Sequence, residues 1–187
     1  MPDACGLPPD WAQQITDFWF SKLTPRDRFS GKIEVDLMIR AKFGALWDVV
    51  HSHFAINEAS SVTEAHAAII ILDQFSRNLF RRTAAAYSAD DVAVRLARWV
   101  IETGLDTGLP IDARQFAYMP FMHSEDRALQ ARSLDLFSNL GRPDLVGYAA
   151  HHKRIIDRFG RFPHRNEVLN RSSTTAEIKY MESENRF

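Results

Sequence analysis

Apolar residues recur at helical spacing along most of the chain, and no segment alternates apolar and polar residues as a half-buried strand does. The clearest stripe, with spacing i, i+4, i+7, i+8, i+11 and i+15, predicts a long amphipathic helix through Ile39, Phe43, Leu46, Trp47, Val50 and Phe54. A second aromatic face predicts a first helix that holds Trp11, Ile15, Phe18 and Trp19. The pattern therefore favours an all-α fold.

Capping and breaking residues predict where the helices begin and end. Residues 24–31 read as a polar turn, and Ser61 with Glu64 forms a capping box for a helix that runs toward Phe80. Ser88 resembles the cap of a helix that stops at Gly104. The later helices are bounded by Asp112 and Pro120, by Ser124 and Gly141, by Pro143 and Gly160, and by a Thr174–Glu177 capping box at the last start.

These signals give seven or eight helices with short connections and no low-complexity linker. Consecutive helices joined by short loops pack antiparallel, so we expect helical hairpins stacked side by side. At 187 residues the chain fits a single domain over 1–187, or two closely packed helical halves, and buries about 70% of its unfolded surface.

Composition limits the classes of partner. The net charge of −1 gives no general attraction to nucleic acid or to anionic lipid. No apolar run approaches the ~20 residues that cross a bilayer, and the N-terminus does not read as a signal peptide. The single cysteine, Cys5, excludes an internal disulfide and is expected to be a mobile thiol. We therefore expect a cytoplasmic protein that binds neither nucleic acid nor membrane.

Three segments carry polar residues that a plain helical domain does not need. The first spans 67–81 and is apolar on every side until Asp73. Asp73 and Arg77 are i, i+4 neighbours, and so are Gln74 and Asn78. The residues allow two interpretations, a buried ion pair and amide pair that hold helices in register, or groups that contact a ligand.

The second segment, 118–126, places His123 between Met122 and the predicted cap Ser124, with Glu125 and Asp126 after it. The acids can simply complement the positive end of a helix dipole. His123 can be a general base, a metal ligand or a buried imidazole with satisfied hydrogen bonds.

The third segment, 151–171, is the most informative, because its cations alternate with phenylalanine, glycine and proline. Three of its arginines, Arg158, Arg161 and Arg165, form the cluster, and because they cannot lose their protons each needs an acceptor. One interpretation pairs them inside the chain with Asp73, Glu125, Asp126 and Asp157. The other directs two or three of them at a phosphate or carboxylate ligand. His152 shares a helical face with Ile155 and Ile156 and so faces the core.

Metals and cofactors receive less support. His123, Glu125, His152 and His164 supply suitable ligand atoms, but they lack His-x-x-x-His or Glu-x-x-His spacing, and nearby arginines repel a cation. The chain has no phosphate loop, dinucleotide fingerprint or nucleophile elbow, and we predict no cofactor.

The motifs LDQFSRNLFR, YMPFMHSEDRALQ and RFGRFPHRNEVLNRSSTTAE, in this order and spacing, resemble a bacterial family known as domain of unknown function 924. The resemblance covers nearly the whole chain and implies an all-α fold similar to the right-handed superhelices of tetratricopeptide repeats. It implies no established activity.

Two positions depart from the family's pattern, because Arg82 and Asn170 stand where glycine is usual. Asn tolerates left-handed backbone geometry, whereas Arg82 is expected to alter its loop. The positions that match the family's pattern are Asp73, Gln74, Arg77, Asn78, Arg81, Pro120, His123, Ser124, Glu125, Gln130, His152, Arg158, Gly160, Arg161, Pro163, His164, Arg165 and Asn166.

We predict that the three segments converge in a polar cleft that binds a small anionic ligand or an acidic peptide. One alternative is a hydrolase or transferase with His123 and Glu125 as its acid-base pair. The other is an internal polar network in a protein-interaction scaffold. Whether the protein is an enzyme, and whether it is a monomer or a homodimer, stays open. The predicted ligand-binding residues are Asp73, Arg77, Asn78, Arg81, His152, Arg158, Arg161, His164, Arg165 and Asn166.

Overall fold

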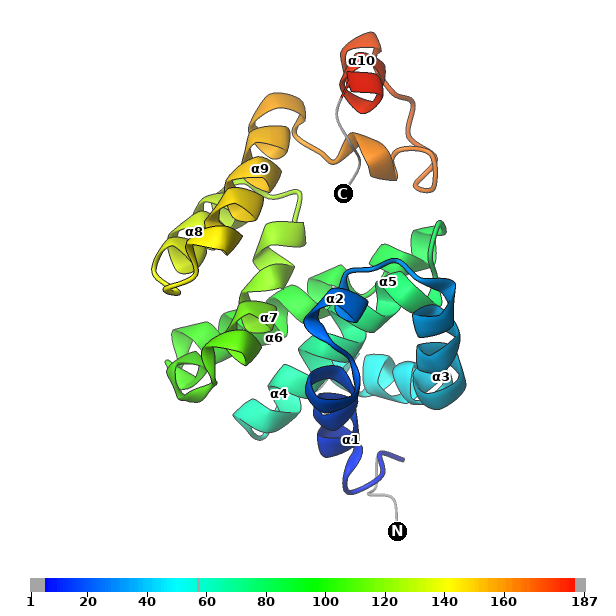
Figure 1. Ribbon diagram of the computed structural model, residues 1–187, viewed down its shortest axis with the longest axis vertical. Coiled ribbons are helices and arrows are strands. Elements are labelled where there is room, and N and C mark those ends of the chain that lie inside the picture. The colour runs from blue at the N-terminus through cyan, green and yellow to red at the C-terminus, as the bar shows by residue number, and fades with distance from the viewer. Residues whose placement is uncertain (1–5, 57, 184–187) are drawn as a thin grey trace. The chain divides into compact units, whose positions relative to one another are not determined.

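The computed structural model describes residues 6–56 and 58–183, so Cys5 lies outside the described residues. The described residues form helices and loops without a strand, which confirms the all-α prediction (Figure 1). They divide into two compact units. Unit 1 holds the residues through Arg81 together with Ala85–Pro120, and unit 2 holds Arg82–Ala84 and the residues from Phe121 onward. The single-domain and superhelix predictions stay predictions.

The elements between residues 11 and 123 follow one another with short connections, and their residues belong to unit 1 except Ala84 and 121–123. One run of helix includes a π-helical stretch, η2, between α4 and α5, and η1 is also π-helical. The bounds are α1 (Trp11–Asp17), η1 (Phe18–Lys22), α2 (Pro25–Arg28), α3 (Ile33–Ile56), α4 (Val62–Ile69), η2 (Ile70–Phe75), α5 (Ser76–Leu79), η3 (Ala84–Tyr87), α6 (Asp90–Glu102), η4 (Leu105–Gly108) and α7 (Ile111–His123).

Aromatic side chains form the core of unit 1. The rings of Phe18 and Phe43 lie 5.0 Å apart between centroids, and those of Phe43 and Phe75 are also 5.0 Å apart. Trp19 packs on Phe75 at 5.5 Å. The predicted stripe of α3 is buried at Ile39, Phe43, Trp47, Val50 and Phe54, while Leu46 is half-buried. Edge-on and tilted pairs of this kind add roughly 0.5–1.5 kcal/mol each beyond the burial of apolar area.

Several predicted helix starts are wrong by a few residues. The segment predicted as a turn contains α2, which the Thr24–Asp27 capping box begins. Helix α6 begins at Asp90 after an uncapped Ala89, because the Ser88 hydroxyl donates to the carbonyl oxygen of Ala85 instead.

Near the middle of the chain, α7 continues three residues past Pro120 to His123. The next helix is capped by Asp126, which accepts from the Leu129 N–H at 2.9 Å, and not by Ser124. The Ser124 hydroxyl instead accepts from the N–H of Asp126, in the turn just before the helix. A serine in that turn resembles a helix cap in the sequence.

The capping boxes predicted at Ser61 and Thr174 have different outcomes. The Ser61 hydroxyl accepts from the Glu64 N–H at 3.2 Å, but the Glu64 carboxylate reaches the N–H of Ser60, so only half of the box forms. At the last helix both bonds are present between Thr174 and Glu177, at 2.7 and 3.2 Å. That capping box is confirmed.

Unit 2 is built on a helical hairpin. Helices α8 (Arg127–Ser138) and α9 (Pro143–Phe159) pack side by side (Figure 1), as the short connection between them predicts. Helix α9 ends at Phe159, and Gly160 caps it with a φ of 72°, the left-handed geometry that glycine favours. The chain continues through η5 (Pro163–Arg165) to α10 (Thr175–Ser183).

The two positions that depart from the family's glycine pattern both have positive φ. Arg82 has a φ of 63° and Asn170 a φ of 55°. The left-handed turn is therefore kept at both, and Arg82 does not remove it. No helix among the described residues is long and apolar enough to cross a membrane.

Candidate functional site

The first polar segment forms a network of ion pairs and hydrogen bonds inside unit 1. Asp73 is fully buried, and Arg77 lies 3.3 Å from its carboxylate and 3.1 Å from that of Asp90. Burial alone would lower the pKa of Arg77, but the two carboxylates outweigh it and raise the pKa. Gln74 donates its amide to Asp73. Arg77 is therefore held by two acids of its own unit.

Arg81 and Asn78 share one acid, Asp36 of α3. Arg81 donates to both of its oxygens, at 2.6 and 2.8 Å, and the Asn78 amide donates at 2.7 Å. The predicted Gln74–Asn78 pair is thus wrong, because Asp36 offers a charged acceptor. These contacts favour the network interpretation for the first segment.

In unit 2, Glu125 is an acceptor for the loop after α9. Its oxygens accept from Arg171 at 2.7 and 3.0 Å and from the Phe162 N–H at 2.8 Å. Burial would raise the pKa of Glu125, but these donors outweigh burial and lower the pKa. A carboxylate so held favours a structural role over that of a general acid. The predicted acid-base pair with His123 gains no support from these contacts.

His152 is buried against His123, with ring centroids 6.0 Å apart. Its Nδ1 donates to the Tyr148 carbonyl oxygen at 2.8 Å, which leaves Nε2 unprotonated in the neutral ring. Burial, with the nearby His123 second, lowers the pKa of His152 to about 3. His152 faces the core as predicted and is a neutral group of the interior.

The arginines of the third segment have different acceptors from those predicted. Arg161 is bound by Glu177 of α10, at 2.7 and 2.9 Å, and by the Ser172 carbonyl oxygen. Arg165 is buried, and donates to the His123 carbonyl oxygen at 2.9 Å. The sequence analysis did not predict Glu177 as the acceptor for Arg161, because Glu177 was interpreted only as part of a capping box.

The other two predicted ligand residues here are Asn166 and His164. Asn166 is buried and donates to the Ser173 hydroxyl at 3.0 Å, whereas His164 is exposed beside the Phe162 ring. The second and third segments therefore meet within unit 2, around Glu125, His152 and Arg165. The first segment belongs to unit 1.

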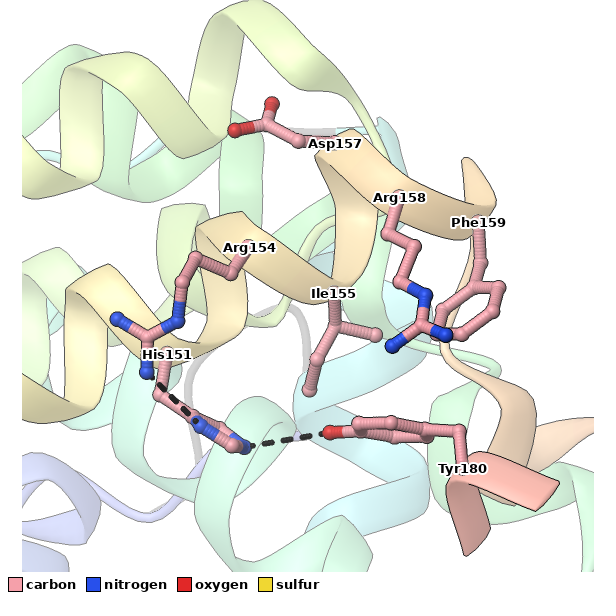
Figure 2. Close-up of a pocket in the computed structure, with 7 residues that line it drawn as sticks. All are labelled: His151, Arg154, Ile155, Asp157, Arg158, Phe159 and Tyr180. Carbon is pink, nitrogen blue, oxygen red and sulfur yellow. Dashed lines mark hydrogen bonds between the residues drawn. The ribbon is translucent and has the colours of Figure 1, made fainter. Parts of the chain in front are cut away.

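A pocket of about 430 Å³ opens on unit 2 between α9 and α10 (Figure 2). Its volume lies in the range of small-molecule sites. Tyr180 lines it from α10, and the remaining lining residues lie on α9: His151, Arg154, Ile155, Asp157, Arg158 and Phe159. Of the predicted ligand-binding residues, Arg158 lines this pocket.

Two guanidinium groups line the pocket without a carboxylate partner among the described residues. Arg158 lies over the Phe159 ring, 4.7 Å from its centroid, and 5.9 Å from that of Tyr180. Within the part of the chain that the structure describes, Arg154 makes one hydrogen bond, to a ring nitrogen of His151. The one acid of the lining, Asp157, accepts from Lys153 at 2.6 Å and points away from Tyr180 (Figure 2).

A short chain of hydrogen bonds connects the two helices. Arg154 lies 3.3 Å from Nδ1 of His151, and the Tyr180 hydroxyl lies 3.4 Å from Nε2 (Figure 2). Because arginine can only donate, Nδ1 is the acceptor and the proton of the neutral ring is on Nε2, which donates to the Tyr180 oxygen. The tyrosine ring is thereby oriented along one side of the pocket.

Sequence reasoning missed His151, Arg154 and Tyr180. The signal was present in part, because positions 151, 154 and 158 recur at i, i+3 and i+7 and so share one face of a helix. Tyr180 could not be found this way, since it comes from a helix more than twenty residues later. Among the described residues no cluster of His, Cys, Asp and Glu can hold a metal ion.

Comparisons with known proteins place the chain in a family. The model of a family described as bacterial protein of unknown function (DUF924) matches residues 15–185, so the chain belongs to this family. A solved structure, that of the protein of unknown function ATU0120 from Agrobacterium tumefaciens, is similar at 35% identity. The match covers 92% of this chain and 97% of that one, with a TM-score of 0.80. Comparison with proteins of curated function finds no match.

Proposed function

We propose that the protein binds a small anionic ligand in the pocket between α9 and α10. The observation that carries the proposal is the pair of guanidinium groups, Arg154 and Arg158, that line a pocket without a carboxylate partner among the described residues. Arginine presents a planar fork of donors that matches carboxylate and phosphate oxygens. An anion supplied from outside completes these donors.

Helix geometry supports the pairing of the two arginines. They are i, i+4 neighbours on α9, and like charges at this spacing destabilise a helix by a few tenths of a kcal/mol. Arg154 has Asp157 at i+3, but that carboxylate bonds with Lys153. A bound anion offsets part of this positive charge, so binding also stabilises the helix.

The test is a thermal-shift screen of the full chain against inorganic phosphate, phenylphosphonate, benzoate and an acidic hexapeptide. A ligand at ~100 times its dissociation constant stabilises the fold by ~2.7 kcal/mol, which a melting curve resolves. We expect phosphonate or carboxylate to raise the melting temperature, and the double variant Arg154→Gln, Arg158→Gln to lose the shift.

The matched control is Arg98→Gln, which removes the same charge from an exposed arginine of α6 in unit 1. A shift that survives in the double variant, or that Arg98→Gln also abolishes, contradicts the proposal. A shift with the peptide but with none of the small anions replaces the proposed ligand by an acidic protein segment.

A further inference from the structure

The α9–α10 pocket combines charged donors with apolar side chains. Figure 2 shows Arg154 near His151 and Arg158 beside Phe159, with Ile155 between the two arginines, and Ile155, Phe159 and Tyr180 supply the apolar side of the pocket. Ile155 is buried in the core of unit 2, whereas Phe159 and Tyr180 are half-buried and present part of their rings. A ligand in this pocket therefore meets charge and apolar surface at once.

The Tyr180 ring is fixed in place before any ligand arrives. His151 holds its hydroxyl, and the Phe159 ring packs against it at 5.2 Å and 55°. Helix α10, which carries Tyr180, is tied to the loop after α9 by the Arg161–Glu177 ion pair. A preformed aromatic wall loses little conformational entropy on binding, so a flat group that packs on it is favoured.

The position of Arg158 sets the anion beside that wall. Its guanidinium carbon lies 4.7 Å from the Phe159 centroid and 5.9 Å from that of Tyr180, which places the cation next to the rings. Arg158 makes no hydrogen bond to another described residue, so its N–H groups are open to an oxyanion. An oxyanion bound there holds any group attached to it against the rings.

We infer that the ligand is an oxyanion that carries a planar apolar ring, an aryl phosphate, phosphonate or carboxylate, and not a bare inorganic anion. This inference rests on the proposed function of the same pocket. The oxyanion binds Arg158, and the ring packs on the apolar surface that Ile155, Phe159 and Tyr180 form. A bare phosphate fills a small part of the 430 Å³ and leaves the apolar side in water.

The experiment compares inorganic phosphate, methylphosphonate and phenylphosphonate by isothermal titration calorimetry on the full chain, with benzyl alcohol as the neutral ring. We expect phenylphosphonate to bind at least ~10-fold more tightly than methylphosphonate, which corresponds to ~1.4 kcal/mol, and benzyl alcohol to bind weakly or not at all. The matched pair of variants is Tyr180→Ala and Tyr148→Ala, since Tyr148 is an exposed tyrosine of α9 outside the pocket lining.

Tyr180→Ala should reduce the preference for the phenyl compound, and Tyr148→Ala should keep it. Equal affinity for the methyl and phenyl compounds, with both lost in Arg158→Gln, overturns this inference and leaves the proposed function standing. If none of the anions binds, the proposed function fails, and the inference fails with it. The comparison of ligands on the unmodified protein decides the question even if Tyr180→Ala does not fold.

Discussion

The arginines of unit 1 and those of α9 have opposite surroundings. In unit 1, Arg77 binds the carboxylates of Asp73 and Asp90, and Arg81 binds that of Asp36, at 2.6–3.3 Å. Arg154 and Arg158 line a pocket, and the described residues give neither of them a carboxylate. The difference separates arginines that hold the fold together from arginines that have donors left for a ligand.

The largest expected effect is on the stability of unit 1. Arg77→Met leaves the fully buried Asp73 without its guanidinium partner, and removing one member of a buried pair costs about 3–5 kcal/mol. Urea unfolding followed by circular dichroism measures this change. A loss below ~1 kcal/mol would show that Arg77 is not a structural ion-pair partner.

Arg158→Gln is the matched change on the other side of the comparison. It removes a cation that lies over the half-buried Phe159 ring, a contact of about 0.5–1 kcal/mol. We expect the free energy of unfolding to fall by no more than that amount. A loss as large as that of Arg77→Met would put both arginines in the structural class.

Acid should weaken unit 2 through His152. Its pKa of about 3 in the fold lies below the ordinary ~6.5 of the unfolded chain, so the unfolded state binds more protons between these values. The contribution of neutral His152 to the free energy of unfolding is therefore fully present above about pH 6.5. It is lost as the pH drops toward 3, by an amount on the order of a few kcal/mol. Urea unfolding at pH 7.0, 6.0 and 5.0 should show this slope, and His152→Gln should flatten it.

Glu177 affects stability at lower pH than His152 does, so the two contributions can be separated. The hydrogen bond from Arg161, before all other causes, lowers its pKa to about 2, below its ordinary value. Its contribution is present above the unfolded pKa of ~4.3 and disappears as the pH falls toward 2. Between pH 7 and 5, the difference in the pH dependence of the unfolding free energy between the wild type and His152→Gln should therefore be due to His152. An unchanged slope in the variant contradicts the buried neutral imidazole.

The smallest expected effects on stability come from Arg82 and Asn170, the two residues other than glycine whose backbone has a positive φ among those the structure describes. Arg82→Gly removes the strain of a side chain at a φ of 63° and should stabilise the protein by roughly 0.5–1 kcal/mol. Asn170→Gly should gain only a few tenths, because asparagine tolerates this conformation. Melting temperatures of the two variants check the order, and a lower stability for Arg82→Gly would contradict it.

The fold followed from local patterns in the sequence. Features that depend on residues close together in the sequence could be predicted from it. These are the apolar stripe of α3, the turn at Gly160 and the Thr174–Glu177 capping box. The exact starts of α6 and α8 were missed, because a serine near a helix start can bond elsewhere in the same turn.

The site depended on contacts between distant residues, and these were harder to predict. The pattern identified Arg161 as a ligand residue, but Glu177, sixteen positions later, binds it. It missed Arg154 and Tyr180, because their importance arises only when α10 packs on α9. A count of nearby acids cannot tell which arginine is satisfied, as Asp36 and Arg81 lie 45 residues apart.

The most direct test is calorimetric titration of phenylphosphonate into the wild-type chain, Arg158→Gln and Arg81→Gln. Both variants lose one arginine charge, but Arg81 is bound by Asp36 in unit 1, whereas Arg158 lines the pocket of unit 2. We predict that Arg81→Gln binds with the affinity of the wild type and that Arg158→Gln loses at least ~10-fold. Equal affinities for Arg158→Gln and the wild type would contradict the assignment of the pocket as an anion site.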